Sequence, residues 1–390
     1  MDTGHDQDPV YLDNAASSWP KPAPVITAME RVMREASANP GRSAHRMSIE
    51  AARVIADARL EVAALFGIHD PLRVVFTKNA TESLNIVIRG LLRPGDHVIV
   101  SSMEHNSVMR PLTMASRYGV VVEAVRCFGD GTLDPDEVRR AIRKSTRLVL
   151  HTHASNVSGA VMPAAAIGLV AREHGVYHCV DAAQSAGCLP IDVDAMNIDF
   201  LCFTGHKALY GPQGTGGLYV REGLEGELDP LMTGGTGSLS EREEQPAFMP
   251  DKYESGTPNT VGIAGLLEGV RFVRRTGVDA IRVHEMRLAE ALMDGMSSLR
   301  GVRIVGPRDR ENRIAVVSVT VEDADPSELA FMLDDVHGVM TRPGLQCAPS
   351  AHRTLGTFPA GTLRFSPGFF TTEDQIDRAV RAMAAVAGKP

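Results

Sequence analysis

Between about residue 70 and residue 220, strand signals alternate with helix signals along the sequence. The strand signals are apolar runs at residues 73–77, 96–102, 120–127, 147–152, 176–180, 200–203 and 217–220. Helix signals lie between them, at residues 81–92, 104–118 and 163–174, and a further helix opens at Asp134-Pro135, where an N-cap precedes a proline. Such alternation is typical of an α/β fold, in which helices cover both faces of a mostly parallel sheet.

The sequence after residue 220 has a different organisation. Residues 221–260 are rich in glycine and charge without clear periodicity, so we expect a long functional loop or a hairpin there. Helices at 261–275 and 279–299 then lead into strands at 302–306 and 314–321, a helix at 327–337, a strand at 362–366 and a helix at 372–387. This order favours a smaller α+β domain. The expected division is an N-terminal arm at 1–20 that packs with the small domain, a large domain at 21–262 and the small domain at 263–390.

Composition limits the classes of function. A chain of 390 residues suits two or three domains with a sizeable core. The net charge of -8, without a basic tract, argues against nucleic acid and anionic membranes as main partners. The acidic, polar start does not resemble a signal peptide, and no apolar run approaches the about 18 residues of a membrane span. We therefore expect a cytoplasmic protein, with its five cysteines as free thiols.

Two apolar runs end in side chains with complementary chemistry. Asp181 follows the run at 176–180, and Lys207 lies shortly after the run at 200–203. Because ligands of open α/β sheets bind outside the carboxyl ends of the strands, we expect the two side chains to converge. Pyridoxal phosphate (PLP) chemistry needs this pair, since a lysine amine holds the aldehyde and an aspartate keeps the pyridine nitrogen protonated. The sequence therefore predicts a PLP site.

Other polar residues lie near the same predicted sheet edge. Thr81 begins a helix directly after a strand, which is suited to a phosphate, although a plain N-cap would look the same. Thr204 and His206 flank the lysine and could add donors to that phosphate. His105 follows a strand that ends at residue 102, but by position alone it could also be an incidental histidine.

A metal site is not predicted. His151 and His153 share one face of an extended strand, but no further ligand follows at metal spacing. Both are interpreted as ordinary strand residues.

One cysteine differs from the others. Cysteines 127, 179, 188 and 202 lie within or beside apolar runs, as core residues do, whereas Cys347 lies in a segment punctuated by proline and glycine at 342–349. We expect this segment to be an exposed loop. With Arg342, His352 and Arg353 nearby, Cys347 is a candidate thiolate nucleophile, and chance exposure is the alternative.

An arginine stands in an apolar strand. Arg364 lies within the run at 362–366 and should need a carboxylate partner, which a substrate could supply.

Taken in order, these motifs resemble the class V, fold-type-I PLP enzymes, in particular the cysteine desulfurases and selenocysteine lyases. The resemblance covers nearly the whole chain. Its motifs are YLDNAA at 11–16, NATE at 79–82, EHNS at 104–107, NVSG at 156–159, DAAQ at 181–184, TGHK at 204–207, ESGTPN at 254–259, RPGLQC at 342–347 and Arg364. It implies a PLP-dependent transferase fold of type I, with a mostly parallel large domain of the seven-stranded type and a smaller α+β domain.

The resemblance also implies residue roles. The cofactor-binding residues would be Ala80, Thr81, His105, Asn156, Asp181, Gln184, Thr204, His206, Lys207 and Thr257. The substrate-binding residues would be Asn156, Arg342 and Arg364, and the catalytic residues Lys207, Cys347 and His105. Within this set, His105 would stack on the cofactor ring, Gln184 would contact the ring hydroxyl, and Thr257 would reach the phosphate of a second subunit. Lys207 would also move the substrate Cα proton.

The activity implied is that of a homodimeric cysteine desulfurase. It would convert L-cysteine to L-alanine and place the sulfur on Cys347 as a persulfide for an acceptor protein. The short segment between Cys347 and Arg364 is typical of the acceptor-dependent group, although Gln346 stands where that group usually has histidine, and Pro343 stiffens the segment.

Three alternatives stay open. The chain could be a selenocysteine lyase that takes L-selenocysteine, or a pathway-specific C–S lyase or other class V enzyme. It could also be a PLP-binding docking protein without turnover. Catalytic release of alanine from cysteine separates the enzyme from the docking protein.

Overall fold

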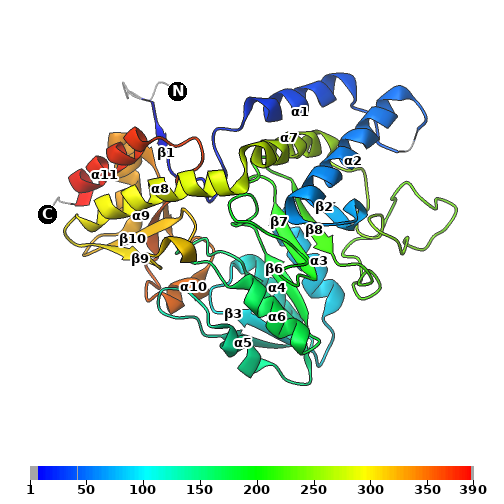
Figure 1. Cartoon of the computed structure of the whole chain (residues 1–390), viewed down its shortest axis with the longest axis horizontal. Helices are drawn as coiled ribbons and strands as arrows, with labels where there is room; N and C mark the ends of the chain where they lie inside the picture. The colour runs from blue at the N-terminus through cyan, green and yellow to red at the C-terminus, as the bar shows by residue number, and fades with distance from the viewer. Residues whose placement is uncertain (1–7, 42, 388–390) are drawn as a thin grey trace.

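The computed structural model describes residues 8–41 and 43–387. Within these residues, seven strands form the large sheet (Figure 1). Across the sheet they are β2 (Val74–Thr77), β8 (Gly216–Val220), β7 (Phe200–Thr204), β6 (Tyr177–Asp181), β5 (Thr146–Thr152), β3 (His97–Ser101) and β4 (Val121–Val125). β8 runs antiparallel to both of its neighbours, and the other strands run parallel to one another. The mostly parallel α/β sheet expected from the sequence is confirmed.

Helices cover both faces of the large sheet, as parallel strands require. On one face, α3 (Ala80–Leu91) and α4 (Asn106–Ser116) pack through Leu84 and Leu112 against the inward side chains of the central strands. On the other face lie α2 (Arg46–Phe66), α5 (Pro135–Ala141), α6 (Ala164–Glu173) and α7 (Thr260–Thr276). Burial on both faces explains why the central strands read as continuous apolar runs.

The first two helices were not predicted from the sequence. α1 (Ala23–Glu35) and α2 both pack against α7, which begins at residue 260, far beyond the end of α2 at residue 66. Between β8 and α7, residues 221–259 contain neither helix nor strand, so the expected long loop is confirmed and the hairpin alternative is wrong.

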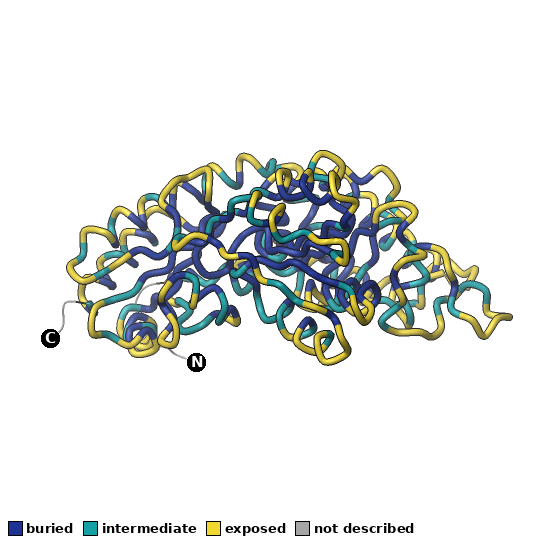
Figure 2. Tube along the Cα trace, turned by 90° about the horizontal axis from the view of Figure 1, so that it is seen from below, coloured by how far each residue is buried: buried dark blue, intermediate teal, exposed yellow. Residues whose placement is uncertain are grey.

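A second, antiparallel sheet lies in the C-terminal part of the chain. Within the described residues it has four strands, β12 (Arg342–Gly344), β13 (Thr362–Phe365), β10 (Val317–Val321) and β9 (Val302–Val305). It shares a core with α8 (Val278–Ser297), α9 (Pro326–His337) and α11 (Glu373–Ala387). Figure 2 shows buried chain running through the middle of an elongated molecule, with exposed chain along its outer edges.

The N-terminal segment joins the smaller sheet region. β1 (Val10–Tyr11) pairs in parallel with β11 (Val339–Met340), and Asp13 forms a bridge with Ser366. This placement fits an arm that packs with a small domain, although residues 1–7 of that expected arm lie outside the described residues. The domain boundaries at 20 and 262 stay a prediction.

The cysteine segment is more ordered than expected. Residues 342–349 were predicted to be a loop, but the structure has β12, a turn and the start of α10 (Pro349–Thr354). Pro343 is tolerated in β12 because this strand lies at the edge of its sheet, where a missing N–H costs no ladder hydrogen bond.

Candidate active site

The carboxyl ends of adjacent strands meet at one edge of the large sheet. Thr152 and Asp181 end β5 and β6 in paired register, and Thr204 ends β7. A cavity of about 280 Å³ opens at this edge. It is lined by Ala15, Ala16, Asn79, Ala80, Thr81, His105, Ser107, Thr152, Asn156, Asp181, Ala183, Gln184, Thr204, His206, Lys207, Arg342, Gln346, Cys347 and Arg364. Every site residue predicted from the sequence lines this cavity except Thr257.

Lys207 and Asp181 are buried and electrostatically coupled. Burial lowers the pKa of the Lys207 amine to about 8, although the nearby Asp181 carboxylate opposes this effect. Burial raises the pKa of Asp181, opposed by the Ala183 N–H, which donates to Oδ1 at 2.9 Å, and by Lys207. A lysine with a lowered pKa has a substantial neutral fraction near pH 8, which is the form that attacks an aldehyde.

One end of the cavity is suited to an anion. α3 begins there, and its cap residue Asn79 accepts the Glu82 N–H at 3.0 Å. Thr81 Oγ1 and Ser107 Oγ lie 2.7 Å apart between the starts of α3 and α4. His206 Nδ1 is buried and has no hydrogen-bond partner within residues 8–41 and 43–387. Because an unpaired buried nitrogen is costly, this atom fits a ligand oxygen such as that of a phosphate.

His206 and His105 are both held neutral. Burial lowers the pKa of each ring to about 4, and the charge of Lys207 adds to the effect. His105 caps α4, and its Nδ1 accepts the Ser107 N–H at 3.0 Å. The ring proton of neutral His105 therefore lies on Nε2.

Arg364 already has a carboxylate partner within the chain. Its Nη2 lies 2.6 Å from Asp13 Oδ1, and its Nη1 donates to the Asn156 carbonyl at 3.0 Å. The expectation that Arg364 needs a carboxylate partner is confirmed, since Asp13 supplies one, and its contact with a substrate carboxylate stays a prediction. Arg364 Nε is buried and unpaired among the residues that the structure describes, so its N–H remains for a ligand, together with the second N–H of each terminal nitrogen.

The side-chain amides of Asn156 and Gln184, which were predicted to contact a ligand, each donate a hydrogen bond to the protein backbone. Asn156 Nδ2 donates to the Gln346 carbonyl at 2.7 Å, and Gln184 Nε2 donates to the Ala15 carbonyl at 3.0 Å. The oxygen and the second N–H of each side-chain amide remain available to a ligand.

Cys347 is exposed, and the other four cysteines are buried free thiols. Of its three expected basic neighbours, Arg342 lines the same cavity. His352 does not serve Cys347, because it is buried and its ring nitrogens contact Gln346 and Thr357 at 2.9 and 2.7 Å. The guanidinium of Arg353 lies over the Phe358 ring, 4.3 Å from its centroid. The expectation that His352 acts on the thiol is therefore wrong, whereas a role for Arg353 near Cys347 stays a prediction.

Thr257 lies in a different cavity, of about 350 Å³, which the loop after β8 forms with residues near β2. Within one chain the structure does not bring Thr257 to Lys207. Its predicted contact across a dimer stays a prediction.

Sequence reasoning missed several residues that hold the site. From the N-terminal segment, Ser18 Oγ donates to the Lys207 carbonyl at 2.7 Å, and Lys21 Nζ donates to the His206 carbonyl at 2.9 Å. Buried Glu104 accepts the Thr152 N–H at 3.0 Å, and burial raises its pKa to about 8. The sequence signal that could have predicted Glu104 is its position directly before His105, just past the end of a strand.

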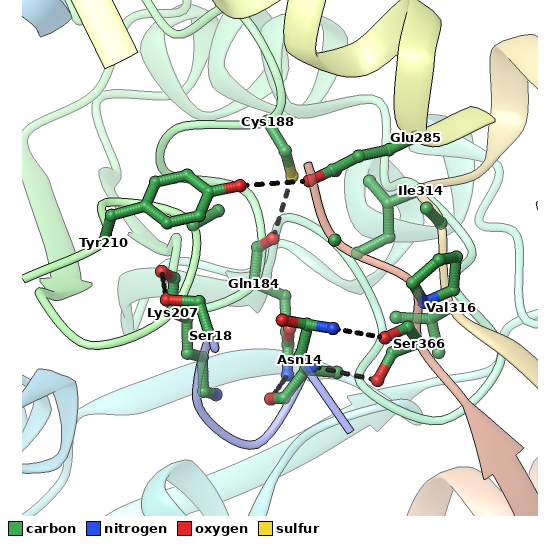
Figure 3. A pocket seen from close by; sticks show the side chains of 15 residues that line it. Asn14, Ser18, Gln184, Cys188, Lys207, Tyr210, Glu285, Ile314, Val316 and Ser366 are labelled. Carbon is green, nitrogen blue, oxygen red and sulfur yellow. Dashed lines mark hydrogen bonds between the residues drawn. The ribbon is translucent and has the colours of Figure 1, made fainter. Parts of the chain in front are cut away.

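A smaller cavity of about 40 Å³ adjoins the first and shares Ala15, Gln184 and Lys207 with it (Figure 3). In Figure 3, Tyr210 and Glu285 point toward each other across this cavity, where the phenol donates to the carboxyl at 3.3 Å. Burial raises the pKa of Glu285 to about 8.

No group of three or more His, Cys, Asp or Glu side chains that could hold a metal ion was found within the described residues. His151 instead contacts His178, with the two Nε2 atoms 3.0 Å apart. In the same part of the chain, no helix combines the length and the apolar character needed to cross a membrane.

The family described as aminotransferase class-V matches residues 10–379. The chain belongs to this family. It is 37% identical over 386 residues to a Methanothermobacter thermautotrophicus protein named "Probable cysteine desulfurase", covering 98% of this chain and 96% of that protein. The apo structure of cysteine desulfurase from Thermococcus onnurineus NA1 matches with a TM-score of 0.92 and 33% identity, over 97% of this chain and 94% of that one.

A second solved structure is similar. The cysteine desulfurase CsdA of Escherichia coli, in an S-sulfonic acid form, matches with a TM-score of 0.86 and 28% identity, over 97% of this chain and 94% of that one. These findings confirm the resemblance and the fold class expected from the sequence.

Proposed function

We propose that this aminotransferase class-V protein is a PLP-dependent cysteine desulfurase, which converts L-cysteine to L-alanine and transfers the sulfur to Cys347. The observation that carries this proposal is that Cys347 and Lys207 line one cavity. A buried amine suited to an aldehyde and an exposed thiol suited to sulfur thereby face the same ligand. The similarity to proteins named cysteine desulfurases supports the same substrate class.

The residues present fit PLP. Lys207 would be the attachment point, Asp181 would pair with the ring nitrogen, and the unpaired His206 Nδ1 would bind a phosphate oxygen. Thr81, Ala80 and Thr204 would complete the phosphate end, while Gln184 would contact the ring hydroxyl and His105 would cover one ring face. When bound, PLP supplies an electron sink for the bonds of the substrate Cα.

The chain itself orients the substrate and moves its protons. The unpaired Nε–H of Arg364, with Arg342 and the second N–H of Asn156 Nδ2, would bind the α-carboxylate. The Lys207 amine would take the Cα proton, because a base with a lowered pKa gives up and regains protons near neutral pH. These interactions direct the substrate sulfur toward Cys347.

Sulfur transfer balances without an outside oxidant. The Cys347 thiolate forms an S–S bond to the substrate sulfur while the Cβ–S bond breaks, and its electron pair ends on Cβ as a new C–H bond after protonation. The two sulfurs are oxidised by one electron each, and the carbon is reduced by two. Cys347 is left as a persulfide, and the carbon skeleton leaves as alanine.

We also propose that the active unit is a cytoplasmic homodimer in which Thr257 reaches the phosphate of the neighbouring subunit. The separate position of Thr257 supports this arrangement, because its own chain does not use it at the cavity. Delivery of the persulfide sulfur then needs an acceptor, either a protein or a small thiol. The division into an arm at 1–20 and domains at 21–262 and 263–390 belongs to the same proposal.

The proposal is tested by alanine release from L-cysteine, measured with and without a thiol acceptor. Wild-type protein should release alanine catalytically, and Cys347→Ala should retain PLP but lose nearly all of this activity. Equal alanine rates in the two proteins would remove Cys347 from the reaction. Bound PLP with no alanine from wild type would favour a docking protein instead.

A further inference from the structure

The backbone at the acceptor cysteine adopts an uncommon conformation. Gln346 has a φ of 40° and Cys347 a φ of 59°, and both values lie in the left-handed region. Neither residue is glycine, and non-glycine residues populate this region only where surrounding contacts hold them there. Two consecutive residues in this state need an anchor.

The side chain of Gln346 supplies that anchor. It is only 5% exposed, and its carboxamide is fully hydrogen-bonded. Nε2 donates to the carbonyls of Arg342 and Thr362 at 3.2 and 3.1 Å. Oε1 accepts from Thr362 Oγ1 at 3.2 Å and lies 2.9 Å from His352 Nε2. Because both donors and both lone pairs are used, a single orientation of the amide satisfies the site.

His352 completes the network rather than acting on the thiol. Its Nδ1 lies 2.7 Å from Thr357 Oγ1, and burial lowers the pKa of the ring to about 4. A neutral ring that donates a hydrogen bond from Nε2 to Gln346 Oε1 accepts a hydrogen bond from the Thr357 hydroxyl at Nδ1. Both nitrogens of the imidazole are therefore occupied, and the ring orients the Gln346 side chain.

Hydrogen bonds also join the backbone of residues 346–347 to residues that follow strands of the large sheet. The Gln346 carbonyl accepts from Asn156 Nδ2 at 2.7 Å, and the Cys347 carbonyl accepts from the Asn106 N–H at 2.8 Å. Asn106 begins α4, directly after His105. The turn is therefore fixed from both sides, while Cys347 itself remains exposed.

We propose that Gln346 is a positioning residue, which fixes Cys347 in the left-handed conformation that directs its thiol at the substrate sulfur. The inference rests on the proposed function of Cys347 as sulfur acceptor. Gln346 acts through geometry alone, because an amide takes no proton from a thiol at ordinary pH. Pre-organisation of the nucleophile lowers the cost of reaching the transition state.

The experiment compares Gln346→Met with wild type in the PLP-loaded full chain. Methionine keeps the length of the side chain but removes all of its hydrogen bonds. A matched control is Gln375→Met, which removes an amide contact at the start of α11, where Oε1 accepts the Thr372 N–H at 3.1 Å. Two rates are measured for each protein: persulfide formation in a single turnover with L-cysteine, and alkylation of Cys347 by iodoacetamide.

We expect persulfide formation by Gln346→Met to fall roughly tenfold to a hundredfold, the range for a misplaced reacting group. Alkylation should stay within about twofold of wild type or increase, because a small reagent needs an accessible thiolate and no alignment. The Gln375→Met control should match wild type in both. General unfolding would behave differently, since the four buried cysteines would then also be alkylated.

A second variant, Gln346→Glu, keeps the protein testable if the methionine variant does not fold. It retains Oε1 as an acceptor for His352 but sets an oxygen against the carbonyls of Arg342 and Thr362. It should show the same separation of the two rates. Wild-type persulfide rates in both variants, with loss of activity in Cys347→Ala, would overturn the inference alone. Full activity in Cys347→Ala would instead overturn the proposed function.

Discussion

The carboxylate of Asp13 lies 2.6 Å from the guanidinium of Arg364, although 351 residues separate the two along the chain. The pair joins the N-terminal segment to β13 beside the cavity that Arg364 lines. Arg364 is 2% exposed and Asp13 21% exposed, so solvent screens this pair only weakly. The N-terminal segment therefore builds part of the active site.

Asp13→Ala should destabilise the protein by about 3 kcal/mol, the lower end of the range for a broken buried pair, because Arg364 is left as an uncompensated buried charge. Chemical unfolding of purified protein measures this loss. The matched control is Glu373→Ala, which breaks an exposed pair with Arg287 and should change stability by less than about 1 kcal/mol. Equal effects of the two substitutions would contradict a special role for Asp13.

Asp181→Ala should lower alanine production by roughly a hundredfold, the usual effect of losing one electrostatic partner of the reacting group, while PLP content falls far less. The proposed attachment at Lys207 and the proposed phosphate contacts would remain in this variant. Turnover and PLP per chain are measured on the same preparation. Turnover close to wild type would show that Asp181 is not the partner of the ring nitrogen.

Thr257 tests the dimer. If Lys207→Ala and Thr257→Ala are each inactive, dissociating and reassembling an equal mixture should restore about a quarter of wild-type activity, since half the dimers are mixed and each has one intact site. Size-exclusion chromatography confirms assembly. Full activity of wild type as a monomer would refute the arrangement.

Cys347 should matter more for sulfur than for selenium. The C–Se bond is weaker and a selenol is more acidic, so selenium can leave without attack by a protein thiol. Cys347→Ala should therefore lose alanine production from L-cysteine but keep a sizeable part of any activity on L-selenocysteine. Alanine release on both substrates makes the comparison, and parallel loss on both would argue against this distinction.

Glu285 should make stability depend on pH. Burial raises its pKa from 4.5 to about 8, so the folded protein holds a proton that the unfolded chain releases between these values. Stability should then fall as pH rises through this window, by up to about 1.4 kcal/mol per pH unit for one proton. Arg282, Cys188 and Tyr210 are the charged or titratable neighbours.

Glu285→Gln should remove that contribution. Unfolding free energies of wild type and variant are compared at about pH 5.5 and about pH 7.5, where buried Glu104 contributes equally to both proteins. If the difference in unfolding free energy between wild type and Glu285→Gln is the same at both pH values, Glu285 is ionised in the folded state.

Local sequence patterns predicted most of the large sheet. The central strands are buried on both faces, so their residues form apolar runs that stand out from the surrounding helices. α1 and α2 were missed because no strand signals flank them and their packing partner, α7, comes much later in the chain. β12 was missed because Pro343 and Gly344 signal a loop, and only pairing with β13 makes this segment a strand.

The sequence by itself determined that Asp181 and Lys207 come together, because they follow adjacent buried strands whose ends must meet at one sheet edge. Only the tertiary structure decided which groups surround Arg364 and Cys347. The packing of the N-terminal segment brings Asp13 to Arg364. His352 contacts Gln346, and not Cys347 as expected, within a buried hydrogen-bond network. Such contacts join residues through side-chain direction and distant packing, which no local periodicity encodes.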